Sequence, residues 1–579
     1  MHTEYSCILV AVCTSRHVLP VDDHFVRRVW GSLGAMRAPL SKDGYEEVMG
    51  WEDRDGEEKT LDDAAAIKAG SGAGAMSAEA CEIAATELGG FAGEARNQGG
   101  LALPVSLSMV CNRVMSLTSV AFVGRLGPVP LAAAALATTL GNVTGNSIMV
   151  GMASAVSTLG GQAYGAGSYH TLGYVLQRAV IILSIAALPI SLAWWCSEGI
   201  LVNLGQEPAL AQASAAYIRA LIPGLFFYAW NMCLTAYLQS QRVTKPAALA
   251  GVVAAVMHVP ANVVFIHALK FGYVGAALAT SWSNGVVLCL NVLYAVRFKV
   301  DEPGRETWPG FSARAATTEW KPFLALALPG ILMMAEWWAS EANILLAGLL
   351  PDPEYNVAAV SIFQVTNALA FMVPVGFSVA VSTRCANELG ARRPAHAKFA
   401  SRTAFSLILA VELIVSTLLL AVKRHWGRLY TDDERIVRLV SELLVPLAVY
   451  TFFDGMLCVA TGVIKACGRQ WVAGPVVFFS YYVVGIPLAC WLSFGSPAIG
   501  AMGLVVGGTV GTIIHSVIIL VLVQNTDWIG EVTRAFERVE ATGFCRKDAG
   551  GSDTDAEALL PDVCAEVELQ DMKKKSGDN

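Results

Sequence analysis

Three acidic residues lie inside long apolar stretches of the sequence, where acids are rare: Glu336, Glu341 and Asp454. A charge at the centre of an apolar membrane span costs about 2.5–3.5 kcal/mol on insertion scales, so such a side chain needs a partner or a water-filled cavity. Carboxyl groups in such positions can bind and release a small cation. We predict that these residues form a cation-coupling site. A structural hydrogen bond to a neighbouring helix is the alternative for each, above all for Glu341.

The spacing of the acids refines this prediction. Glu336 and Glu341 are five positions apart, so on an ideal helix they point about 140° from one another, at roughly 100° per residue. We therefore expect them to have different functions. Two carboxylates that share a desolvated pocket titrate as a coupled pair. Protonation would remove the negative charge that holds a cationic solute or a sodium ion, so the predicted chemistry is the exchange of one cation for another.

Amide and aromatic side chains in the same stretches are the candidate solute contacts: Asn112, Asn231, Gln364, Asn367, Trp337 and Tyr450. The amides could bind a solute, although hydrogen bonding between helices is an equally good explanation. The rings could stack on a flat organic cation. Packing against other helices or lipid is the alternative for the rings.

Two further acids, Glu412 and Glu442, lie nearer span ends or face unknown neighbours and are predicted to be structural. Three histidines lie apart from the acids in sequence and are predicted to be non-functional: His258, His267 and His515. Arg113 is expected to pair with an acid or to extend its guanidinium toward the membrane surface. Many of the thirteen cysteines lie in apolar runs without metal-ligand spacing, which is typical of small core residues. We predict no metal site and no cofactor beyond a proton or sodium ion.

The composition explains where these residues must lie. The chain has 579 residues, of which 55% are hydrophobic and 15% charged, and its mean hydropathy is +0.52. Such a chain belongs in a bilayer. The net charge of −7 gives no basis for nucleic-acid binding. Nucleophile–base motifs, phosphate-binding glycine loops and metal clusters do not occur in the sequence, so an enzyme is not expected.

Windows of about 19 residues predict an all-α polytopic membrane protein with about twelve transmembrane helices. The first six lie near 101–124, 132–156, 172–195, 214–238, 247–269 and 273–296. The second six lie near 322–350, 356–381, 400–422, 437–463, 472–494 and 500–523. The predicted domains are a disordered cytosolic tail (1–95), an N-lobe (96–297), a cytosolic linker (298–321), a C-lobe (322–524) and a cytosolic C-terminal tail (525–579).

Both tails are placed in the cytosol because an even number of spans returns the chain to one side, and the loops on that side are rich in Lys and Arg.

The start of the natural chain is open between Met1 and Met36. The segment from Asp555 to Leu560 fits an acidic dileucine sorting signal. This signal favours the vacuolar membrane over the plasma membrane and predicts a sorting adaptor as a partner of an otherwise monomeric chain.

The two halves resemble each other. With a shift of about 225 residues, Gly151–Thr158 aligns with Gly376–Thr383, and Gly165 aligns with Gly390. Each copy contains six spans, so both enter the membrane in the same orientation and are related by an axis along the membrane normal. When Pro223 is aligned with Pro446, Asn231 falls on Asp454, so the acid of the tenth span has an uncharged counterpart in the N-lobe.

Several motifs together resemble the multidrug and toxic compound extrusion (MATE) family, specifically its plant DETOXIFICATION branch. They are Phe122–Gly127, Gly161–Ala166, Gln177–Ala179, Glu336–Glu341, Ser382–Arg384, Asn387–Ala391 and Asp454–Gly455. The resemblance covers roughly 100–530 and implies antiport by two six-helix lobes, with Glu336 and Asp454 as the cation site. The acid that some members carry in the first span is absent, since Ser108–Arg113 contains none.

The leading hypothesis is therefore an antiporter that exports or sequesters organic cations, alkaloids, flavonoids or xenobiotics in exchange for protons or sodium ions. Export of an organic acid or a hormone is the second hypothesis, which a more basic cleft would favour. A passive channel or a lipid-precursor flippase belongs to another class. Channels commonly repeat a pore-lining motif around an axis, and the sequence contains no such repeat.

Overall fold

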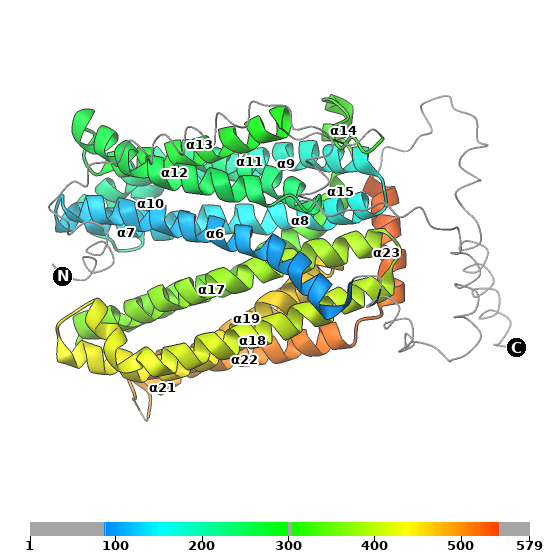
Figure 1. Cartoon of the computed structure of the whole chain (residues 1–579). Coiled ribbons are helices and arrows are strands. Elements are labelled where there is room, and N and C mark those ends of the chain that lie inside the picture. Colours follow the sequence, from blue (N-terminus) through cyan, green and yellow to red (C-terminus); the bar gives the residue numbers. More distant parts are fainter. Residues whose placement is uncertain (1–85, 87–88, 299–300, 302–303, 497, 543–579) are drawn as a thin grey trace, which may run out of the picture.

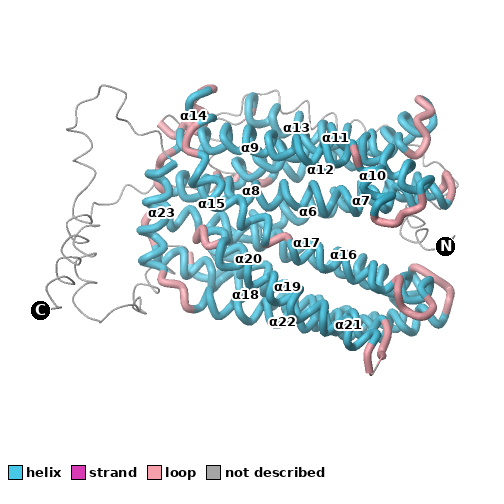
Figure 2. Tube along the Cα trace, turned by 180° about the vertical axis from the view of Figure 1, so that it is seen from behind, coloured by secondary structure: helices cyan, strands magenta, loops and turns pink. Residues whose placement is uncertain are grey.

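The computed structural model describes residues 86, 89–298, 301, 304–496 and 498–542. Within these ranges the chain consists of helices and loops, without strands (Figure 2). The predicted all-α fold class is confirmed. The expectations for residues 1–85 and for the sorting signal from Asp555 to Leu560 lie outside the described residues.

Long helices joined by short loops make up the first half of the chain. Their bounds are α6 Gly90–Gly124, α7 Pro128–Gly141, η1 Asn142–Asn146, α8 Ser147–Gly165, α9 Tyr169–Trp195, α10 Ser197–Asn203, α11 Pro208–Ser240, α12 Lys245–Val263, η2 Val264–Ala268 and α13 Val274–Arg297. The predicted linker then contains the short helix α14, Ala313–Thr317.

The second half has the same design. Its helices are α15 Trp320–Leu332, α16 Ala335–Ala347, α17 Pro353–Gly390, α18 Pro394–Trp426, η3 Gly427–Leu429, α19 Glu434–Ala466, α20 Gln470–Phe478, η4 Phe479–Gly485, α21 Ile486–Phe494, α22 Ala501–Gln524 and α23 Trp528–Thr542. Thus α6 begins inside the predicted N-terminal tail, and α23 belongs to the predicted C-terminal tail.

Eleven helices of the described chain are long and apolar enough to cross a membrane. Twelve were expected, and the missing one is the segment near 132–156. There α7, η1 and α8 follow one another without a loop. Polar residues such as Asn142, Thr144 and Asn146 make this segment less apolar than the eleven membrane-crossing helices. Because α8 is buried among other helices over most of its length, it needs less apolar surface than a helix that faces lipid.

The helices form two groups, the first from α6 to α13 and the second from α15 to α22. The groups meet at the end of the molecule that carries α23 and diverge toward the end with α7, α10 and α21 (Figure 1). The first helix of each group crosses to the other group's core. Phe323 and Leu326 of α15 pack into the core formed mainly by α8, α9 and α11. Leu101 and Ala102 of α6 pack into the core of α17, α18 and α19. This exchange ties the two groups together.

Two helices related by the predicted repeat cross at the end where the groups meet. A Cβ atom on Gly165 of α8 would collide with the backbone carbonyl of Asn387, and one on Gly390 of α17 would collide with that of Gln162. The shift that aligns Gly165 with Gly390 also aligns Gln162 with Asn387. The contact is therefore reciprocal, and a side chain at either glycine would force the helices apart.

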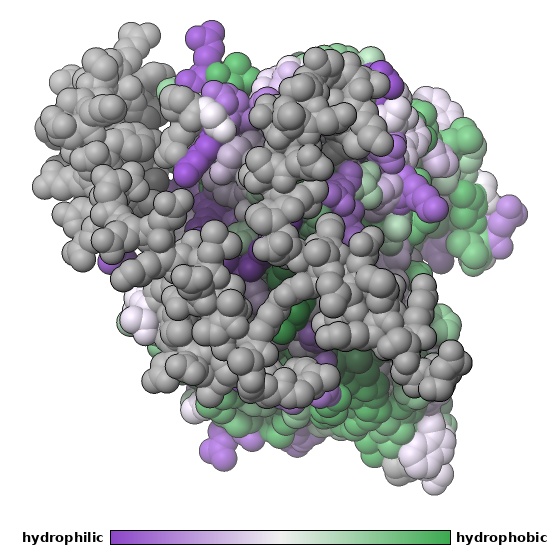
Figure 3. Space-filling view, turned by 90° about the vertical axis from the view of Figure 1, so that its right-hand side faces the viewer, coloured by the Kyte–Doolittle hydropathy of each residue, from purple (hydrophilic) through white to green (hydrophobic). Residues whose placement is uncertain are grey.

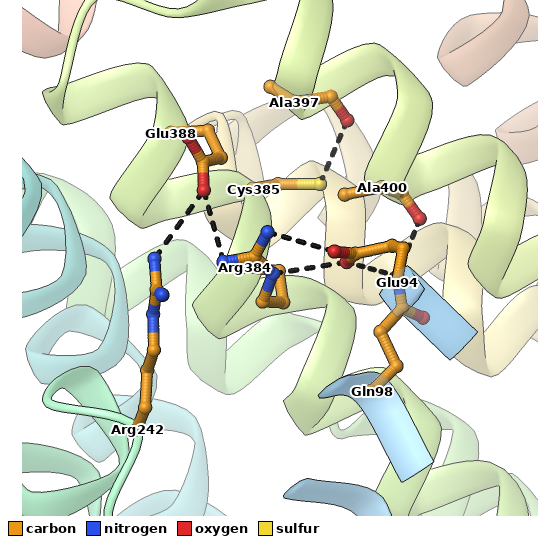
Figure 4. Close-up of polar contacts among 8 residues, drawn as sticks. All are labelled: Glu94, Gln98, Arg242, Arg384, Cys385, Glu388, Ala397 and Ala400. Atoms are coloured by element: carbon orange, nitrogen blue, oxygen red, sulfur yellow. Dashed lines mark hydrogen bonds and ion pairs between the residues drawn. The ribbon is translucent and has the colours of Figure 1, made fainter. Parts of the chain in front are cut away.

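A buried ion network joins the two groups beside this crossing (Figure 4). Arg384 of α17 donates two hydrogen bonds, of 3.0 and 2.9 Å, to the carboxylate of Glu94 on α6. Its third nitrogen lies 3.0 Å from Glu388, which also contacts Arg242 at 3.4 Å. Gln98 donates to Glu94 at 2.9 Å. The side chains of Arg384 and Glu94 are only 3% and 0% exposed, so water does not screen this pair.

The helix α23 covers the same end. Its buried Glu531 lies 2.8 Å from Arg534, 3.8 Å from Arg469 and 3.9 Å from Arg538. The hydrogen bond from Arg534 to Glu531 raises the pKa of that guanidinium, whereas burial lowers the pKa of Arg538. Figure 3 faces this end, where hydrophilic residues gather in the upper part and apolar residues cover the flank below.

Candidate coupling site

The predicted seventh span, 322–350, is two helices rather than one. Helix α15 ends three residues after Pro329, and α16 begins after a two-residue turn. Proline lacks a backbone N–H and crowds the preceding turn, so Pro329 weakens α15 in the turn before this interruption. The interruption places Glu336 in the first turn of α16. The hydroxyl of Tyr482 donates to the carbonyl of Ala335 at 3.0 Å and so holds the start of α16 in place.

Glu336 and Asp454 meet at this interruption. Asp454 lies on α19 and is 4% exposed, and its carboxyl group is within hydrogen-bonding reach of that of Glu336. A hydrogen bond between two carboxyl groups requires that one of them holds a proton, because an ionised carboxylate only accepts. The hydroxyl of Tyr481 also donates to Glu336, at 2.6 Å. The structure thus brings together two of the three predicted coupling acids.

Two residues of the site were not predicted, Tyr481 and His515. The Tyr481 hydroxyl lies 2.9 Å from that of Thr512, and its ring packs edge-on against His515, with the ring centroids 5.7 Å apart. His515 Nδ1 lies 3.8 Å from Glu336. His515 was predicted to be non-functional because it lies far from the acids in sequence, whereas the structure places it beside them. The available signal was the group of polar residues in the middle of the mostly apolar α22: Thr509, Thr512, His515 and Ser516.

Glu341 is on the same helix as Glu336 but has a different environment. It interacts electrostatically with Arg113 of α6. Arg113 therefore has an acid within range, which was one of its two predicted roles. Because α6 and α16 come from different groups of helices, this interaction bridges them. Glu341 does not join the cluster of Glu336, Asp454 and Tyr481.

A pocket in the second group adjoins the acids. It is narrow and opens to solvent at its mouth. Its described lining combines aromatic, amide and apolar residues, without Lys or Arg: Ala339, Ser340, Asn343, Val360, Phe363, Gln364, Tyr450, Tyr481, Gly485, Ile486, Leu504, Val505 and Gly508. Because Tyr481 belongs to both the wall and the acid cluster, a solute in this pocket would lie one side chain away from Glu336.

Two of the predicted solute contacts line this pocket, Gln364 and Tyr450. Gln364 donates to the backbone carbonyl of Ser340 at 3.2 Å, and its amide oxygen remains available. The ring of Tyr450 packs edge-on against that of Phe363, at 6.3 Å. Asn367 interacts with Tyr450 but is not one of the described residues that line the pocket.

The other predicted solute contacts lie elsewhere. Trp337 is 41% exposed and does not line the pocket. Asn231 accepts a hydrogen bond of 2.8 Å from Asn291, which is the interhelical role left open by the sequence. Asn112 is exposed on α6. His258 bonds serine hydroxyls through both ring nitrogens, at 2.9 and 2.8 Å, as a structural residue would.

Comparison with known proteins supports the motif-based resemblance. The family model MatE matches residues 104–264 and 330–491, one match in each half of the chain. Protein DETOXIFICATION 16 of Arabidopsis thaliana is 36% identical over 447 residues, covering 76% of this chain and 90% of that protein. Protein DETOXIFICATION 15 of the same organism is 34% identical over 455 residues, covering 78% and 91%.

Solved structures show the same fold. The crystal structure of the eukaryotic MATE transporter AtDTX14 superposes with a TM-score of 0.73 at 29% identity, over 78% of this chain and 99% of that one. An outward-facing multidrug resistance MATE family transporter of the MOP superfamily shares the fold at 18% identity, with a TM-score of 0.67 over 77% and 97%. The predicted resemblance is confirmed, and the family comprises transporters and not enzymes. The chain, a multi-pass membrane protein, belongs to the MatE family.

Proposed function

We propose that this transporter is a secondary active antiporter that exports or sequesters small organic molecules in exchange for protons. The observation that carries the proposal is the contact in mid-span between the carboxyl groups of Glu336, which is half-buried, and Asp454, which is buried, beside a pocket with aromatic and amide walls. A carboxyl pair in this position can hold one proton between its two members and release it when a cation takes its place.

The mechanism that we propose follows from the position of Tyr481. Its hydroxyl donates to Glu336 and its ring forms part of the pocket wall. A cationic solute in the pocket favours ionised carboxyl groups, whereas proton uptake neutralises them and weakens the attraction. Proton binding from the outer or luminal side would therefore release the solute, and proton loss toward the cytosol would prepare the site for the next one.

The chemistry of the pocket favours organic cations and neutral aromatic molecules. Phe363, Tyr450 and Tyr481 offer ring surfaces, and Asn343 and Gln364 offer amides. An organic acid would need a basic group, and the described lining contains neither Lys nor Arg. Alkaloids, flavonoids and xenobiotic cations are the proposed substrates, with an organic acid or a hormone as the alternative and sodium as the alternative coupling ion.

The placement of the protein in the cell is part of the proposal. The end that carries α23 also holds Arg384, Arg469 and both ends of the described chain, so we place it on the cytosolic side, where membrane proteins carry more Lys and Arg. The proposed protein is monomeric and lies in the vacuolar or the plasma membrane, where an adaptor that recognises Asp555–Leu560 would direct it.

Transport into sealed proteoliposomes tests the function. An imposed pH gradient should drive uptake of ethidium, a planar organic cation, and Asp454→Asn should reduce that uptake at least about tenfold, because an amide cannot exchange a proton. Uptake that survives the substitution would contradict the proposal. Uptake that follows a sodium gradient and ignores the pH gradient would assign sodium as the coupling ion.

A further inference from the structure

A third acid lies close to the coupling pair, on a helix that otherwise faces outward. Leu409, Leu413 and Ile414 of α18 are 39%, 52% and 67% exposed, as expected for a helix at the periphery of a membrane protein. Glu412, on the same turns, is only 1% exposed. It lies near the middle of α18, Pro394–Trp426. The sequence alone predicted a structural role for it.

The structure leaves space for this carboxyl group at one position of α19. A Cβ atom on Gly455 would collide with the Cγ, Cδ and Oε1 atoms of Glu412. The side chain of Glu412 therefore lies directly against the backbone of Gly455, the residue that follows Asp454. A larger residue at 455 would displace the carboxyl group, so the glycine explains how an acid fits at this helix contact.

Neither carboxyl oxygen of Glu412 has a hydrogen-bond partner among the described residues. Helix α18 packs against α6, α17, α19, α23 and η3. On α19, Asp454 precedes the glycine that contacts Glu412, and the two carboxyl groups interact electrostatically. A structural acid would be expected to bond a neighbouring helix, because an unsatisfied buried carboxyl group is unfavourable. Glu412 has the burial of a core residue without such a bond.

We infer that Glu412 is a third acid of the coupling site, whose protonation is linked to that of Asp454. This inference rests on the proposed function, in which Asp454 exchanges a proton during transport. Two like charges in one low-dielectric region disfavour each other. Ionisation of Asp454 would therefore favour a proton on Glu412, and an ionised Glu412 would favour a proton on Asp454. The site would then titrate as a group of three carboxyl groups and not as a pair.

Infrared difference spectroscopy of the full-length protein in lipid nanodiscs, between acidic and alkaline pH, tests this linkage without any solute. Glu412→Gln keeps the size of the side chain and should remove one component of the carboxylic acid C=O band. It should also move the titration midpoint of the remaining carboxyl groups toward lower pH by about one unit, because the repelling neighbour is gone. Loss of the component without a shift of the midpoint would overturn the linkage.

A second variant and a control make the result specific. Gly455→Ala should displace the Glu412 carboxyl group and shift the same components, although every acid is retained. Glu442→Gln removes an exposed acid from α19 and should leave the midpoint unchanged; a shift equal to that of Glu412→Gln would also overturn the inference. The thermal midpoints of all variants should be compared, so that a loss of folding is detected directly.

The two proposals fail in different assays. If the pH gradient does not drive ethidium uptake in the wild type, the proposed function fails, whatever the infrared titration shows. If uptake is driven and depends on Asp454, but Glu412→Gln alters neither the titration nor the pH profile of uptake, only the inference about Glu412 fails.

Discussion

At the scale of single residues, one hydroxyl group connects the proposed coupling acids to the adjoining pocket. The Tyr481 oxygen donates to Glu336 and lies 2.9 Å from the Thr512 hydroxyl, so it links α16 to α22 through η4. The same residue forms part of the pocket wall. Any change in the charge of Glu336 is therefore transmitted to a side chain that a bound solute would contact.

Tyr481→Phe tests this connection. A hydroxyl that donates to a carboxylate favours the ionised form, so its loss should make Glu336 hold its proton up to higher pH. We expect the pH profile of ethidium uptake to move toward higher pH, with several-fold slower uptake. Tyr482→Phe is the matched control, because that hydroxyl bonds a backbone carbonyl. Equal profiles for both variants would contradict the assigned role.

At the scale of helices, the interruption between α15 and α16 determines the direction of Glu336. Pro329 lies three residues before the end of α15, and Glu336 follows in the first turn of α16. In a continuous helix Glu336 would point in another direction around the helix axis, because each residue adds a rotation of about 100°. The site thus depends on where a helix stops as well as on which residues it contains.

Pro329→Ala restores the missing N–H and should straighten α15 in the turn before the interruption, which changes the direction in which α16 begins. We expect Glu336 to lose its contact with Tyr481, with several-fold lower uptake and unchanged helical content by circular dichroism. Pro446→Ala is the control, because α19 runs without interruption from Glu434 to Ala466 despite Pro446. Normal uptake by Pro329→Ala would show that the direction of Glu336 does not depend on Pro329.

The helix α23 depends on a second local contact. Glu531 is buried, but its arginine partners are 19% to 51% exposed. Loss of a buried ion-pair partner costs about 3–5 kcal/mol, and solvent screening of the arginines reduces this to about 1–2 kcal/mol. Glu531→Gln should therefore loosen α23 and speed its removal by limited proteolysis. The exposed Glu537→Gln should not, and equal cleavage of both variants would argue against the role of Glu531.

At the scale of the whole molecule, the arrangement of the two helix groups defines one conformation of the transporter. The groups meet at the α23 end and diverge at the other (Figure 1). The network of Glu94, Arg384, Glu388 and Arg242 connects them only while they are in contact (Figure 4). Opening at this end would separate Glu94 from Arg384 and hydrate both charges, so the network favours the closed state.

Glu94→Gln should shift this equilibrium. Removal of one partner from a fully buried pair costs about 3 kcal/mol or more, so molecules open at the α23 end should become more populated. Distances between spin labels at His170 and Arg393, measured by electron paramagnetic resonance, report the change. Glu198→Gln breaks an ion pair with Arg219 within one group, at 3.3 Å, and serves as the control. An unchanged distance distribution in Glu94→Gln would remove the network from the closed-state contacts.

The sequence by itself determined the membrane fold, the approximate spans, the repeat and the acids worth testing. Hydropathy identifies spans because each span is an apolar helix that satisfies its backbone hydrogen bonds along its own length, without water. It also isolates Glu336 and Asp454, because acids are rare in such segments. The weakest prediction was the second span, where burial by other helices replaces apolar character.

The tertiary structure alone decided which distant residues meet. Glu94 and Arg384 are 290 positions apart, and neither a periodicity nor a motif pairs them. Tyr481, Thr512 and His515 join the acids because η4 and α22 pack beside the interruption after Pro329. Glu341, five residues from Glu336, faces Arg113 instead. Local patterns specify helices, whereas contacts between helices depend on crossing geometry and side-chain packing, which no single segment encodes.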